Sequence, residues 1–180
     1  MRFTARPNRD RGRRSRAEGQ SLVEFALILT PLFLILLGII QFGFIFNAYI
    51  TITNATREGA REASIYVYDR TLSAGQNDAA RNDVVLNTFQ NSLNLLSPDP
   101  PQFTTSGTWV QSGDAFTNGD LTVSYEIPGG AADSDPRTGQ SVTVQVRYHQ
   151  DLLIPLVAAL LPHDPGGRMI LTGEVTMVIN

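Results

Sequence analysis

The feature that most constrains this chain is an apolar run from Phe25 to Phe46. Every residue in the run is apolar or small except Thr30 and Gln41. A helix of this length, at about 1.5 Å per residue, reaches across a hydrocarbon core of about 30 Å. A cleavable secretory signal would have a shorter apolar region followed closely by a small-residue cleavage site, whereas this sequence continues without one. The run therefore predicts a transmembrane helix over residues 20–46.

Charge is distributed unevenly about this run. Residues 1–19 hold seven arginines against Asp10 and Glu18, and the whole chain has a net charge of −3, so the rest is acidic. The positive-inside rule places such an arm in the cytoplasm and the acidic part outside. A basic arm could also bind nucleic acid, but a basic flank beside a membrane span is the simpler interpretation, and we expect no nucleic-acid partner. The chain has no cysteine, which excludes disulfides and thiolate sites.

A helical pattern continues beyond the apolar run. One stripe is formed by residues that recur at spacings of three and four: Tyr49, Ile52, Thr56, Gly59, Ala63 and Tyr66. Gly59, Ala60 and Ala63 are small enough to let another element approach closely, either the chain's own sheet or a neighbouring subunit. Glu58 and Arg61 lie on a solvated flank at ion-pair spacing. The sequence leaves the partner of the small residues open.

The exported part divides into a helical segment, residues 47–97, and a β-rich region, residues 98–180. The first helix is expected to begin near Gln20 and, if unbroken, to end near Val67. A second amphipathic helix is expected over residues 78–97, with a core-facing stripe of Leu86, Phe89, Leu93 and Leu96. Period-two alternation predicts strands at residues 108–111, 121–127, 141–148 and 169–179. Three or four antiparallel strands with one apolar face need helices to cover them, so the expected fold class is α+β.

Residues that could carry chemistry are few. His149 and His163 have no second ligand at metal spacing, and we expect both to be surface histidines. Asp133 and Asp135 have the spacing of a calcium loop, but Arg137 occupies the third ligand position, so we interpret them as turn residues. Hydrolase and nucleotide-binding signatures are absent from the sequence. We expect no metal, no cofactor and no catalytic residue; a membrane-tethered hydrolase would need an unrecognised site.

A second apolar segment, residues 152–162, is too short to span a bilayer. Two interpretations remain open. The favoured one is a buried or sheet-covering segment. The other is an exposed patch that meets a partner or the membrane surface.

Glu24 is a carboxylate at the mouth of the first apolar run. A charge within the bilayer costs a few kcal/mol, although less near the interface, and the helix macrodipole favours an anion in the first turn. These effects explain the charge but not its neighbours. The pattern is a basic arm, Gly19, four residues, then Glu24 and Phe25.

This pattern resembles the type IV prepilin processing site. The resemblance implies that a membrane prepilin peptidase cuts between Gly19 and Gln20 on the cytoplasmic side and removes residues 1–19 as a leader. It also implies that Glu24, fifth in the mature chain, pairs with the new amino terminus of a neighbouring subunit. Gln20 departs from the commonest prepilin form, which has an aromatic residue or methionine at this position.

A closer resemblance is to the TadE-like family of the tight-adherence (Tad/Flp) pilus systems. It is carried by GQSLVEFALILTPLFLILLGIIQFG and NATREGAREAS, is specific over residues 19–64 and is loose elsewhere. It implies a non-enzymatic minor pilin or pseudopilin in the inner membrane that takes part in pilus assembly with other pilin subunits. The alternative is an uncleaved, single-pass binding module such as an adhesin or envelope receptor. Processing at Gly19 discriminates between the two.

Overall fold

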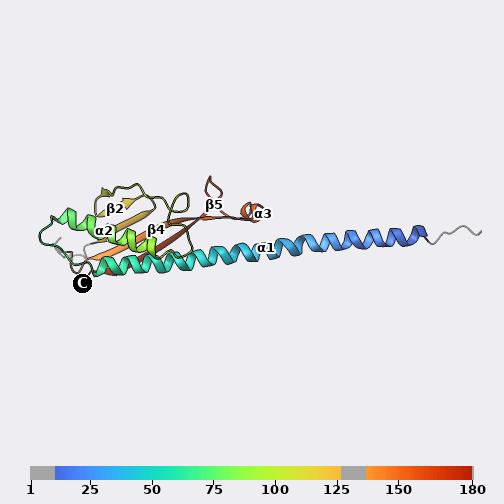
Figure 1. Ribbon diagram of the computed structural model, residues 1–180, viewed down its shortest axis with the longest axis horizontal. Coiled ribbons are helices and arrows are strands. Elements are labelled where there is room, and N and C mark those ends of the chain that lie inside the picture. Colours follow the sequence, from blue (N-terminus) through green and yellow to red (C-terminus); the bar gives the residue numbers. More distant parts are fainter. Residues whose placement is uncertain (1–10, 127–136, 180) are drawn as a thin grey trace, which may run out of the picture.

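A long helix carries a small α+β domain along its C-terminal part (Figure 1). The computed structural model describes residues 11–126 and 137–179, so Asp133 and Asp135 lie outside the described residues. The expected α+β class with a second helix and an antiparallel sheet is confirmed. The sheet has five strands, where the sequence predicted three or four.

Helix α1, Arg11–Ser64, is continuous and contains Pro31. Its 54 residues make a helix about 81 Å long. The prediction that the helix begins near Gln20 was wrong, because the backbone is helical from Arg11 onward. Arg, Ala and Glu are good helix formers, and the apolar run supplies a formed helix from which further turns can grow at little cost. The helix ends at Ser64, three residues before the expected Val67.

Helix α2, Ala74–Asn91, begins and ends earlier than the predicted residues 78–97. Its start is fixed by a capping box: the Ser73 hydroxyl accepts a bond from the Gln76 N–H, and Gln76 Oε1 accepts one from the Ser73 N–H. These bonds satisfy amide donors that a helix N-terminus otherwise leaves unpaired. Residues 74–77, which precede the predicted helix, are therefore the first turn of α2.

The strands form a meander in the order β1-β2-β3-β4-β5, with every neighbouring pair antiparallel. Their bounds are β1 Val110–Ser112, β2 Ala115–Asn118, β3 Leu121–Glu126, β4 Ser141–Asp151 and β5 Arg168–Val178. The strand that the sequence did not predict is β2, which is too short to show a clear alternation. It pairs with β3, and Phe116 lies opposite Val123.

The core lies between one face of the sheet and the two helices (Figure 1). The period-two alternation predicted for residues 141–148 places alternate side chains of β4 in the core, where four are buried: Val142, Val144, Val146 and Tyr148. On the α2 side, Phe89 packs on Phe103, with ring centroids 5.0 Å apart. The other face carries polar pairs between β4 and β5, such as Thr143 with Thr176. This pattern is that of an antiparallel sheet with one covered face.

Candidate functional site

The candidate site is the free part of α1, residues 19–40, which we call the stem. None of its residues is buried. Its large exposed apolar side chains are Leu22, Val23, Phe25, Leu27, Ile28, Leu32, Phe33, Leu34, Ile35, Leu36, Ile39 and Ile40. The stem is about 33 Å long, close to a hydrocarbon core of about 30 Å. Within the described residues, one helix is long and apolar enough to cross a membrane, and it contains the stem. This indicates a membrane anchor.

The four predicted processing residues all lie at the exposed N-terminal end of the stem. A Cβ atom added to Gly19 would meet no neighbouring atom within 4 Å. Gln20 and Glu24 lie one turn apart, and Gln20 Nε2 donates a 3.0 Å hydrogen bond to Glu24 Oε1. Phe25 is 60% exposed. None of the salt bridges between described side chains involves Glu24.

The predicted packing residues Gly59, Ala60 and Ala63 lie far from the stem and are buried in their own chain. A Cβ atom on Gly59 would lie 3.3 Å from Val85 Cγ1, so this glycine lets α1 and α2 approach closely. The structure thus brings Gly59 against α2 and buries Ala60 and Ala63, and it does not bring these residues near Glu24. The sequence analysis placed Tyr49 on the same stripe, but the structure leaves Tyr49 51% exposed.

Gln41 is the functional residue that the sequence analysis missed. Its side-chain oxygen accepts bonds from the N–H groups of Leu153 (2.9 Å) and Ile154 (3.3 Å), and Nε2 approaches the carbonyl oxygen of Asp151 at 3.5 Å. Gln41 is fully buried, and it is the first buried residue of α1 from Gly19 onward. An amide within a long apolar run was the available signal, because such a group needs hydrogen-bond partners.

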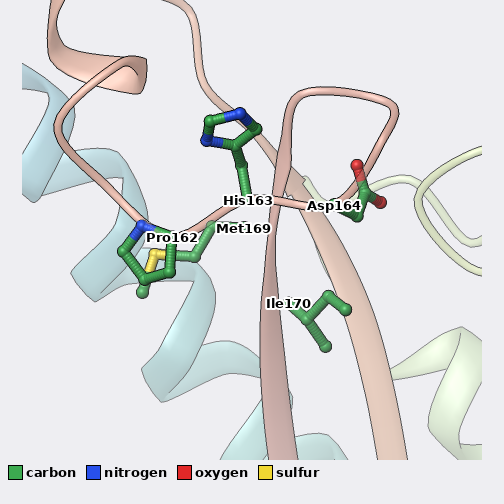
Figure 2. Close-up of a pocket in the computed structure, with 5 residues that line it drawn as sticks. All are labelled: Pro162, His163, Asp164, Met169 and Ile170. Carbon is green, nitrogen blue, oxygen red and sulfur yellow. The ribbon is translucent and has the colours of Figure 1, made fainter.

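The apolar segment 152–162 contains the short helix α3, Pro155–Ala158. The favoured prediction was a buried or sheet-covering segment. Burial was wrong, because none of its residues is buried, although Leu152 and Leu161 are partly buried against the core. Leu153 is 62% exposed and Leu160 is 85% exposed. A pocket of about 200 Å³ lies where the segment turns into β5 (Figure 2), and it is lined by Pro162, His163, Asp164, Met169 and Ile170.

His149 is not the surface histidine that the sequence predicted. Its side chain is 21% exposed, with Nδ1 2.9 Å from Asp164 Oδ2 and Nε2 3.4 Å from Asp120 Oδ1. The backbone N–H of Arg168 donates to Asp164 and, together with the His149 contact, lowers the pKa of this carboxyl to about 2. His163 is exposed, as expected. No group of His, Asp and Glu side chains among the described residues could hold a metal ion.

Stem and domain together define a class: a chain anchored by a single helix that also provides one side of an α+β core. Residues 19–61 match the family model described as TadE-like protein, the family that the sequence resembles. The match covers the stem and continues to Arg61 of α1. No curated protein and no solved structure matches the chain. This part of the chain is therefore similar to TadE-like proteins.

Proposed function

We propose that this chain is a minor pilin or pseudopilin of a tight-adherence pilus. It is held in the inner membrane with its N-terminus in the cytoplasm, and prepilin peptidase cuts it between Gly19 and Gln20. The observation that carries the proposal is the exposed stem, within the segment that matches the TadE-like family. Because none of its residues is buried, the stem is open both to a peptidase and to the helices of other subunits.

Cleavage would act on a position that the fold leaves free. A Cβ atom at Gly19 would meet nothing within 4 Å, so a requirement for glycine there would come from the peptidase and not from packing against this position. Cleavage removes the basic arm and creates an amino group at Gln20. That positive charge then lies at the start of the helix, where the macrodipole disfavours a cation, so it gains from an anionic partner.

Glu24 is the anion that we assign to this role. A carboxylate on a stem surrounded by apolar groups costs a few kcal/mol unless it is paired. The new amino group of a neighbouring subunit supplies the opposite charge, and their attraction is strong where water is excluded. Pairing in this way favours the association of stems in register, which is the step that pilus assembly needs.

Replacing Glu24 by Gln tests this role in cells that make the pilus. The E24Q chain keeps the Gly19 site and should still be cleaved, which the mass of the recovered protein reports. Pilus numbers counted by electron microscopy should fall, because the amide cannot pair with an ammonium group. The matched control is Glu58→Gln on the same helix, where the carboxylate forms a surface pair with Arg61 at 3.1 Å. Normal pilus numbers in E24Q would remove the docking role.

A further inference from the structure

Segment 152–162, which we call the tip, is an apolar feature of the domain outside the core. Its sequence, LLIPLVAALLP, contains no charged residue. Leu153, Leu156 and Leu160 are each more than half exposed. An uncharged, exposed apolar surface of this kind marks a contact with lipid or with another protein.

The tip lies at the end of the domain that faces the stem. Figure 1 shows α3 beside α1 at the limit of the domain, beyond the ends of the strands. Gln41 fixes this position, because its side chain bonds to the backbone of Leu153 and Ile154. The tip is therefore held at the point where the stem ends.

The length of the stem relates this point to the depth of a bilayer. A stem about 33 Å long fills a hydrocarbon core of about 30 Å, so a membrane centred on it ends close to Gln41. The apolar run itself continues to Phe46, past the level of Gln41. The leucines of the tip thus lie at the depth where headgroups meet acyl chains.

The charged groups next to the tip form contacts within the chain. Asp164 contacts His149 at 2.9 Å and accepts a bond from the backbone of Arg168. The tip can therefore enter an apolar layer without removing these charged groups from their partners, which would be costly.

We propose that the tip inserts its leucines into the membrane surface on the side where the domain lies. It is a second lipid contact that fixes the orientation of the domain relative to α1. Short apolar segments bind at this depth by burying a few large side chains between headgroups and acyl chains. Lipid is favoured over a neighbouring subunit because Gln41 holds the tip at the bilayer boundary in every single copy. The inference rests on α1 crossing the membrane and is independent of cleavage and pilus assembly.

The absence of cysteine from the chain allows a direct test with the full-length protein. Single cysteines at Leu156, Ile35 and Val67 are labelled with a polarity-sensitive fluorophore, and each protein is placed in phosphatidylethanolamine–phosphatidylglycerol nanodiscs at one copy per disc. Lipids with a spin label near the top of the acyl chain serve as quenchers. Ile35 in the stem reports the membrane span, and Val67, 84% exposed beyond the end of α1, reports solvent.

We expect the quenching lipid to reduce emission at Leu156 and Ile35 and to leave Val67 unchanged. Reduced emission at Ile35 with unchanged emission at Leu156 would overturn the tip contact while leaving the anchor intact. A blue shift at Leu156 that appears only when discs hold several copies would also overturn it, because it would assign the tip to a neighbouring subunit. Unchanged emission at both Ile35 and Leu156 would contradict both the anchor and the tip contact.

Discussion

At the scale of single residues, the two polar side chains of the apolar run are satisfied in different ways. The Thr30 hydroxyl donates to the carbonyl oxygen of Ala26 at 2.9 Å, within its own helix. Gln41 bonds instead to the backbone of a segment more than a hundred residues away. Polar groups in apolar surroundings must be hydrogen-bonded. Thr30 meets this need locally, whereas Gln41 meets it by joining the domain to the helix.

Asp164 gives a prediction on pH. Its folded pKa is about 2, below the ordinary 3.8, because the Arg168 N–H and His149 favour the charged form. A depressed pKa stabilises the fold above pH 3.8, and this contribution is lost as the pH falls toward 2. Between these values the free energy of unfolding should therefore fall more steeply for the wild type than for Asp164→Asn. Denaturation in detergent at several pH values, followed by the fluorescence of Trp109, measures this free energy. Equal slopes for the two proteins would contradict the assignment.

At the scale of elements, α1 and β5 approach each other closely in the core. A Cβ atom on Gly173 would lie 2.7 Å from Thr56 Oγ1 and 3.2 Å from Ile52 Cγ2. Real side chains do not approach this closely, so even one methyl group must push the strand and the helix apart. The absence of a side chain at Gly173 is therefore what allows the sheet to rest on the helix.

Gly173→Ala should lower the free energy of unfolding by about 1–3 kcal/mol, the usual cost of overpacking a core. The same denaturation measurement reports it. The control is Gly75→Ala in α2, where an added Cβ meets nothing within 4 Å. Adding Thr56→Ala to the variant should recover part of the loss, because it removes the nearest atom. If Gly173→Ala lowers the free energy of unfolding no more than the control does, the contact between Gly173 and α1 is not tight.

The sequence predicts those parts of the fold that a local period determines. The apolar run and the inward face of β4 follow from such patterns, whereas the start of α2 did not, although S-A-G-Q was a readable capping signal. Long-range pairing is beyond this kind of reasoning. Arg81, 1% exposed, pairs with Asp78 at 3.4 Å and lies 5.6 Å from the centre of the Tyr125 ring. A helix pattern alone assigns such an arginine to solvent.

The candidate site was predicted unevenly for a similar reason. Gly19 and Glu24 belong to a short contiguous motif, which one sequence can display. Gln41 and the tip act through a contact between distant segments, so only their unusual polarity or apolarity was visible. The sequence also could not assign the partner of Gly59, because small residues on a helix fit any close neighbour.

At the scale of the whole molecule, one helix has two surroundings. Its N-terminal part is an exposed apolar stem, and its C-terminal part supplies Ile45, Ala48 and Ile52 to the core of the domain. The core therefore begins inside the apolar run, and the domain cannot rotate freely on its anchor. A stem that docks on other subunits would impose its orientation directly on the domain. This rigid link suits a subunit that must be placed in a defined position in an assembly.

The most direct test of this account is the N-terminus of the protein recovered from its native membrane, by intact mass and terminal peptide sequencing. We expect a chain that begins at Gln20, and we expect Gly19→Leu to abolish this cleavage. Gly38→Leu is the matched control, because both glycines lie in the stem and an added Cβ atom at either one meets nothing within 4 Å. This variant should be cleaved normally. A wild-type chain that keeps its arginine arm, in cells with an active prepilin peptidase, would contradict the account and favour an uncleaved membrane-anchored binding module.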